Sequence, residues 1–170
     1  MVKAISVQHV NTAMSILNDI EKLRAAIDDV DHPALLCVDV FASLACDLYE
    51  IVKWSDAVGV CMIVSDPTKH SHSVASVEAK HGIGTKLQNW VKQNVGPTLG
   101  RGLGMADETD PDCHDFFRFG QLGHVNGHMI MGALGAIDAG FNALDILHGT
   151  GALDAASCGI AVSKKHHDSV

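Results

Sequence analysis

The sequence contains no cluster of positive charge and no long apolar run. Lys and Arg number 12 against 20 acidic residues, which gives a net charge of −8 at pH 7, and no run of basic residues exceeds two. Because so few, scattered cations would not neutralise a phosphate array, we expect neither nucleic acid nor an anionic membrane as a partner. No stretch approaches the ~18 consecutive apolar residues of a transmembrane helix, and residues 1–11 lack the apolar core of a signal peptide. The sequence predicts neither secretion nor membrane insertion.

The cysteines do not have the pattern of a disulfide framework. The five cysteines are an odd number, are widely spaced and include no Cys-x-x-Cys pair, so a reduced, cytoplasmic environment fits better than a disulfide framework. With 47% hydrophobic and 19% charged residues, the chain of 170 residues has enough apolar material for a core. A largely disordered protein is therefore excluded, and we expect one domain or two small ones.

The first third of the chain has the pattern of a βαβ unit. Residues 2–9 alternate and predict a strand, and residues 20–30 show helical spacing after a candidate N-cap at Asn18 or Asp19. Residues 34–38 form a continuous apolar run, which is typical of a strand buried on both faces. A strand, helix and strand in this order indicate an α/β unit with a parallel sheet, whose ligands bind at the carboxyl ends of the strands.

The remainder predicts a smaller α+β unit. We expect strands at residues 54–64, 73–78 (half-exposed) and 116–119, and helices at 83–95 and 125–146. The last helix has the strongest signal, with apolar residues in steps of four and three: Ile130, Leu134, Ile137, Phe141 and Leu144. Its four glycines each lower helix propensity by roughly 1 kcal/mol relative to alanine, so close packing against another element must compensate.

Two charged residues stand in apolar surroundings and are candidate binding residues. Asp39 follows the apolar run, where a buried carboxylate needs a partner, either a helix that it caps or a cationic ligand atom such as a protonated ring nitrogen. Arg118 lies among phenylalanines, where a guanidinium would need an anionic partner such as a carboxylate. His124 and His128 have the spacing of two metal ligands on a helix, but no third ligand accompanies them, and we expect no metal site.

Four motifs occur in an order that resembles the class V aminotransferases of the alanine-glyoxylate and serine-glyoxylate type. These are fold-type I enzymes that depend on pyridoxal 5'-phosphate (PLP), and the resemblance covers residues 1–60 and 61–160 in two blocks. The motifs are His9-Val-Asn-Thr12 with Leu17-Asn18-x-Ile20, Leu36-Cys-Val-Asp39-x-x-Ala42-Ser43, Phe117-Arg118-x-Gly120-x-Leu122-Gly123-His124-x-Asn126, and His148-Gly-x-Gly151.

The resemblance implies a role for each candidate residue. Asp39 matches the aspartate that pairs with the pyridinium nitrogen of PLP, Thr12 matches the hydroxyl that contacts the cofactor's ring oxygen, and Arg118 matches the arginine that holds the substrate's α-carboxylate. It also implies a homodimer that transfers an amino group from alanine or serine to glyoxylate or another 2-oxo acid. Residues 1–60 would form part of the large, PLP-binding domain, and residues 61–170 the C-terminal small domain.

The sequence departs from this family at the lysine that forms the Schiff base with PLP. Family members are more than twice as long, and the natural interpretation is an internal deletion near residues 59–62 that removed this lysine. Neither Lys53 nor Lys69 stands at the matching position. Without this lysine, the resemblance leaves no residue to form the Schiff base with PLP or to move the proton during transamination. The alternative function is therefore that of a catalytically inactive remnant that acts as a protein-interaction module.

Overall fold

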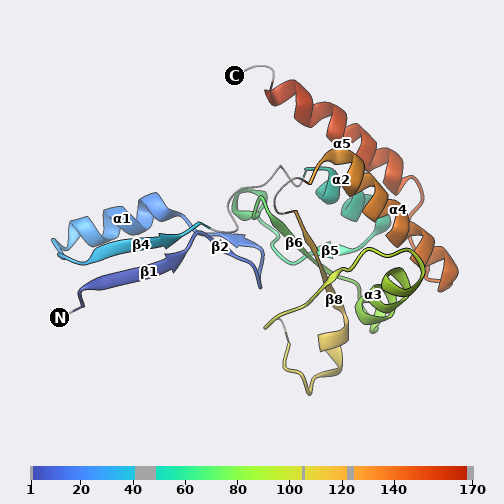
Figure 1. The fold of residues 1–170 in the computed structure, drawn as a ribbon, viewed down its shortest axis with the longest axis horizontal. Helices are drawn as coiled ribbons and strands as arrows, with labels where there is room; N and C mark the ends of the chain where they lie inside the picture. The colour runs from blue at the N-terminus through green and yellow to red at the C-terminus, as the bar shows by residue number, and fades with distance from the viewer. Residues whose placement is uncertain (1, 41–48, 105, 122–124, 168–170) are drawn as a thin grey trace.

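A computed structural model describes residues 2–40, 49–104, 106–121 and 125–167. The chain is mixed α/β, with small parallel and antiparallel sheets. Residues 2–40, here called the arm, extend away from the rest of the described chain, here called the body (Figure 1). Among the described residues, no helix has the length and apolar character needed to cross a bilayer.

The arm is the βαβ unit that the sequence predicts. Strands β1 (Ala4–Gln8) and β4 (Leu35–Asp39) pair in parallel and are joined through helix α1 (Ile20–Asp29). The carboxylate of Asp19 caps α1 by accepting a hydrogen bond from the backbone N–H of Lys22 at 2.9 Å. Between β1 and α1, the short strands β2 (Val10–Asn11) and β3 (Ile16–Leu17) form an antiparallel pair.

The expectation that residues 34–38 are buried on both faces is wrong. Burial alternates along β4, and Leu35 is 66% exposed, with Cys37 and Asp39 also exposed. In the described part of the chain this sheet has two strands, and α1 lies on one side of it (Figure 1). An apolar run predicts full burial only where helices cover both faces of a parallel sheet.

The expected strand at residues 54–64 is also wrong, because helix α2 (Tyr49–Val58) occupies the first five residues of that stretch. Ile51, Trp54, Ser55 and Val58 are buried at helical spacing, and only Cys61–Met62 form a strand, β5. A short apolar run cannot distinguish a buried helix from a buried strand by periodicity alone.

The body contains a four-stranded antiparallel sheet in the order β5-β6-β8-β7. The expected strands at 73–78 and 116–119 are confirmed as β6 (Val74–Glu78) and β8 (Phe116–Gly120), and β7 is Gly100–Arg101. Strand β6 is buried rather than half-exposed, because helices cover one face and the arm residues after β2 contact the other through Ser76.

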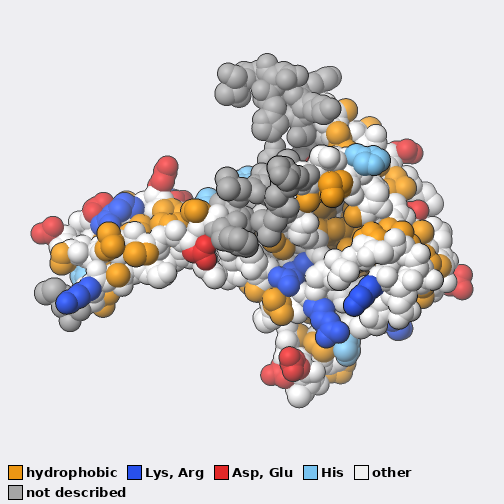
Figure 2. All heavy atoms as spheres, viewed as in Figure 1, with side chains coloured by type: hydrophobic (Ala, Val, Ile, Leu, Met, Phe, Trp, Pro, Cys, Tyr) orange, Lys and Arg blue, Asp and Glu red, His pale blue; other side chains and the backbone are white. Residues whose placement is uncertain are grey.

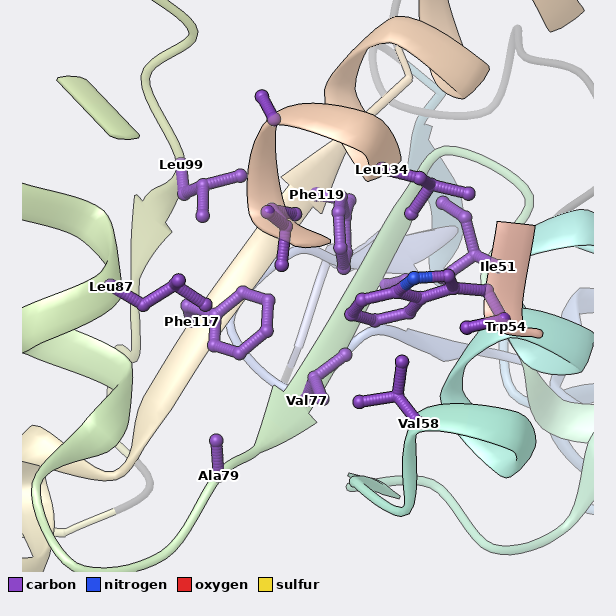
Figure 3. Close-up of a cluster of buried hydrophobic side chains, with 14 of the residues drawn as sticks. Ile51, Trp54, Val58, Val77, Ala79, Leu87, Leu99, Phe117, Phe119 and Leu134 are labelled. Carbon is purple, nitrogen blue, oxygen red and sulfur yellow. The ribbon is translucent and has the colours of Figure 1, made fainter. Parts of the chain in front are cut away.

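The helices of the body pack on one face of this sheet around a continuous core. The expected helices are confirmed as α3 (Ile83–Asn94) and α4 (Gly127–Ala143), and helix α5 (Ala152–His167) packs against α2. Two 3-10 turns, Pro67–Lys69 and Pro111–His114, complete the described elements. Figure 3 shows Trp54 of α2 among side chains from β6, β8 and α4. Its ring meets Phe119 edge-on at 5.6 Å between centroids.

Candidate functional site

Arg118 lies where the arm meets the sheet of the body. In β8 its neighbours Phe117 and Phe119 are buried in the core, so alternation places Arg118 on the opposite face, beside Ser76 of β6 and Gly100 of β7. Its Nε donates a hydrogen bond to the carbonyl oxygen of Arg101 at 2.5 Å. Gly100 leaves room for the guanidinium, since a Cβ there would lie 3.4 Å from Nε of Arg118.

Thr12 and Arg118 are brought together, but through the main chain of Thr12 rather than through its hydroxyl. Nη1 of Arg118 donates to the carbonyl oxygen of Thr12 at 2.6 Å, across 106 residues of sequence. Thr12 itself is an exposed residue. The structure therefore gives Thr12 a contact with the candidate substrate residue, and the predicted contact with a cofactor stays a prediction.

Buried serines hold the arm on the body, and the sequence analysis missed them. Oγ of Ser15 lies 2.5 Å from Oγ of Ser76, and Oγ of Ser76 also donates to the carbonyl oxygen of Ala13 at 3.3 Å. The backbone N–H of Ser71 donates to the carbonyl oxygen of Ser15 at 2.9 Å. Three serines within residues 71–76 were the available signal, because hydroxyls inside an apolar strand need buried partners.

The electrostatics of Arg118 favour an anionic ligand. In the part of the chain that the structure describes, Arg118 forms no ion pair with a carboxylate. Burial lowers the pKa of its guanidinium, because partial desolvation penalises the charged form. An arginine has five N–H donors; two are used by the carbonyl oxygens of Arg101 and Thr12, which leaves three for a ligand.

Asp39 is not the buried carboxylate that the sequence predicts. It ends β4, where its backbone carbonyl accepts a hydrogen bond from the N–H of His9 at 2.8 Å, and the residue is exposed. Alternation along β4 places its side chain with those of Leu35 and Cys37, on the face opposite α1. The argument from an unpaired buried charge therefore does not apply to Asp39.

Lys69 does not take the place of the lysine that the resemblance requires. Lys69 lines a hollow together with Val38 and Val40, on the α1 side of β4, and its Nζ lies 3.5 Å from Oδ2 of Asp66. Lys69 and the carboxylate of Asp39 thus lie on opposite sides of the strand. With an exposed aspartate and no lysine at the position that the resemblance requires, the described residues do not fit PLP as a catalytic cofactor.

A hollow of about 530 Å³ lies beside Arg118, between residues 95–99, the end of β8 and the first turns of α4. Its walls are mostly apolar, with Leu99, Phe119 and Ile130 among them. Gln121 also lines it and is 2% exposed, and among the described residues neither its Oε1 nor its Nε2 has a hydrogen-bond partner. A buried amide without partners is costly, but both atoms have almost no accessible surface, so they do not face the hollow.

Within the described ranges, no group of three His, Cys, Asp or Glu residues could hold a metal ion. His128 is exposed in the first turn of α4, and His124 lies outside the described residues. The motif residues Ala42, Ser43, Leu122 and Gly123 lie outside them as well. The described cysteines, Cys37, Cys61, Cys113 and Cys158, form no disulfide.

No family model matches the chain. Over 53 residues it is 38% identical to a serine-glyoxylate aminotransferase from Arabidopsis thaliana. This stretch is 31% of the chain and 13% of the length of that curated relative. The similarity supports an aminotransferase relationship for part of the chain.

Proposed function

We propose that this chain derives from a class V aminotransferase of the alanine-glyoxylate and serine-glyoxylate type, and that it retains carboxylate recognition at Arg118 without complete transamination. The observation that carries the proposal is the half-buried guanidinium of Arg118, which has spare donors and no described carboxylate partner. A guanidinium that has lost part of its hydration gains more from an anion than an exposed one does.

The ancestral reaction in this proposal moves an amino group from alanine or serine to glyoxylate or another 2-oxo acid. PLP is the cofactor that this ancestry implies, and its ring withdraws electrons from the substrate's α-carbon when it is bound. We derive no catalytic step through it, because Asp39 is exposed and the sequence has no lysine at the position that the resemblance requires.

The proposal treats the chain as a fragment of fold type I, with residues 1–60 from the large domain and residues 61–170 as the small domain. Under this division α2 belongs to the first stretch, although its Ile51, Trp54 and Val58 pack in the core of the body. On the basis of the resemblance, we also propose that the chain forms a homodimer and is located in the cytoplasm.

Binding of small carboxylates tests the role of Arg118. We expect glyoxylate and alanine to bind the wild-type chain in calorimetric titrations, and Arg118→Gln to weaken binding by about 10- to 100-fold, the value of a charged hydrogen bond. Arg101→Gln is the matched control, because it removes the same charge from an exposed neighbour in β7. Equal losses in both variants, or none in Arg118→Gln, would contradict a specific carboxylate site.

Reduction with borohydride in the presence of PLP tests for transaminase chemistry. We expect no specific lysyl adduct, because the sequence has no lysine at the position that the resemblance requires. A stoichiometric adduct that disappears in Lys69→Ala or in Lys53→Ala would instead support a working enzyme.

A second candidate function, that of an interaction module, is favoured by the exposed apolar side chains of the arm. Leu35 and Val30 are 66% and 71% exposed, and Figure 2 shows apolar side chains along the arm. Exposed apolar patches and strand edges without neighbours are typical of association surfaces. We expect Leu35→Lys to reduce self-association in sedimentation experiments and Leu147→Lys, at a fully exposed position of the body, to leave it unchanged.

A further inference from the structure

The side chain of Arg118 lies against a strand position that has no side chain of its own. Gly100 of β7 pairs directly with Arg118 of β8 in the antiparallel sheet, so a side chain at residue 100 would stand beside Arg118 on the same face. A Cβ built on Gly100 would lie 3.3 Å from Cβ, 3.4 Å from Nε and 3.6 Å from Nη2 of Arg118. A glycine inside a strand weakens it and often marks a close approach of another group, which here is the side chain of Arg118.

Strand β7 is held at this position from both sides. Gln88 of α3 is buried, and its Nε2 donates a hydrogen bond to the carbonyl oxygen of Gly100 at 2.5 Å. On the other side, Nε of Arg118 donates to the carbonyl oxygen of Arg101. Atoms added at residue 100 would therefore displace the guanidinium of Arg118 more readily than they would displace the strand.

We propose that Gly100 is a positioning residue for the carboxylate site at Arg118. Because residue 100 has no side chain, the guanidinium reaches the carbonyl oxygens of Arg101 and Thr12, and Nη2 stays open. Among the described residues Nη2 has no hydrogen-bond partner, so both of its N–H donors are left for a ligand. This assignment rests on the proposed function, because the position of the guanidinium affects binding only if Arg118 holds a carboxylate.

The size of the side chain at residue 100 should grade the effect. The single methyl group of Gly100→Ala would make one tight contact, which a shift of a few tenths of an ångström in Arg118 relieves. Gly100→Val adds two more methyl groups beside Nε and Nη2, and relief then requires the guanidinium to leave its carbonyl partners.

Gly120 of β8 provides the matched control. It lies two residues after Arg118, so alternation places it on the same face of the strand. A Cβ built on Gly120 meets no atom within 4 Å. Gly120→Val therefore adds the same side chain to the same sheet without a contact between its Cβ and Arg118.

The experiment measures where the guanidinium is and whether a carboxylate binds it. The sequence has three arginines, so the NMR signal of the Arg118 Nε–H can be assigned by its loss in Arg118→Gln. We expect Gly100→Val to speed exchange of this proton with water by about tenfold or more, and to weaken glyoxylate binding by about 10- to 100-fold, as loss of charged hydrogen bonds does. Gly100→Ala should change both less, and Gly120→Val should change neither.

A second arginine serves as the internal reference for these spectra. Nε of Arg24 donates to Oδ2 of Asp28 within α1, so its exchange should stay the same in every variant. If Gly100→Val does not fold, Gly100→Ala gives the same comparison, with Gly120→Ala as its control.

The outcomes separate this inference from the proposed function. Unchanged exchange of the Arg118 Nε–H in the Gly100 variants, or an equal change in Gly120→Val, overturns the inference whether or not glyoxylate binds. Faster exchange with glyoxylate binding as tight as in the wild-type chain also overturns it. If the wild-type chain does not bind glyoxylate, the proposed function fails, and the exchange rates still decide whether Gly100 positions the guanidinium.

Discussion

Replacing Gly140 with alanine tests how closely α4 packs against α3. An ideal Cβ on Gly140 would lie 2.7 Å from Cδ1 of Leu87 and 3.1 Å from Cε3 of Trp90. Leu87 is completely buried and belongs to the core, so its side chain cannot swing away without disturbing its neighbours. The added methyl group must therefore displace either Leu87 or the helix itself.

The expected magnitude is the difference between two opposing effects. Alanine is favoured over glycine inside a helix by about 1 kcal/mol, while overpacking of a filled core costs about 1–3 kcal/mol. We expect Gly140→Ala to lower the free energy of unfolding by up to about 2 kcal/mol. At Gly132 and Gly135 a Cβ meets no atom within 4 Å, so Gly132→Ala and Gly135→Ala should raise it by about 1 kcal/mol.

Thermal unfolding followed by circular dichroism measures this contrast. For a chain of this size, 1 kcal/mol corresponds to a shift in Tm of about 2–4 °C, and the two classes of variant should shift in opposite directions. If Gly140→Ala raised Tm as much as Gly132→Ala does, α3 and α4 would not pack as closely as the structure places them. The expectation that close packing compensates every glycine of this helix would then fail at Gly140, as it already does at Gly132.

Three further predictions concern the arm and the start of α3. Ser76→Ala removes the partner of Ser15 Oγ and should cost about 1–3 kcal/mol, with faster hydrogen exchange in residues 10–17. Asp115→Ala removes the buried carboxylate that accepts from the N–H of Gly82 at 2.5 Å; chemical denaturation should show a loss of about 1–3 kcal/mol. Hydrogen bonds from Lys22 lower the pKa of Asp19, so its stabilisation of α1 is present above the unfolded pKa and is lost as pH falls through the lowered one. The amide signal of Lys22 should report that midpoint in an NMR titration.

Each of these predictions has an outcome that contradicts it. Unchanged exchange in Ser76→Ala would show that the arm is held by other contacts. Asp115→Asn keeps an acceptor, so a loss equal to that of the alanine variant would argue against the bond to Gly82. For Asp19, a midpoint at the ordinary value would contradict the lowered pKa, and Asp19→Asn, which can still cap α1, should abolish the titration.

Local signals predicted the elements whose structure is decided locally. The cap at Asp19 and the spacing after it located α1, and the apolar steps from Ile130 to Phe141 located α4. The expectations that proved wrong concern residues whose structure depends on their tertiary neighbours. Trp54 lies in an apolar run that suits either a strand or a buried helix, and packing of α2 against α5 decides between them. Burial of Leu35 depends on a covering layer that its own sequence does not specify.

The candidate site also has features that the sequence predicts and features that depend on tertiary neighbours. The aromatic neighbours of Arg118 predicted an anionic partner for its guanidinium, whereas the two acceptors in the structure are backbone carbonyl oxygens. That these are the carbonyl oxygens of Arg101 and Thr12 was not predictable, because the contact with Thr12 joins residues 106 positions apart. For Asp39, the sequence analysis took the strand's apolar character as evidence of burial, and the exposed face of β4 removes that premise.

Burial decides which of the two charged residues can still act. Two unit charges 4 Å apart interact by about 1 kcal/mol in water and by about 4 kcal/mol at the effective dielectric of a protein surface. One pKa unit corresponds to about 1.4 kcal/mol, so the more water screens Asp39, the less this residue can raise the pKa of a neighbouring ring nitrogen. Arg118 is already partly desolvated and positioned by two carbonyl oxygens. Under the proposed function, carboxylate recognition at Arg118 does not require the electrostatic activation of a cofactor.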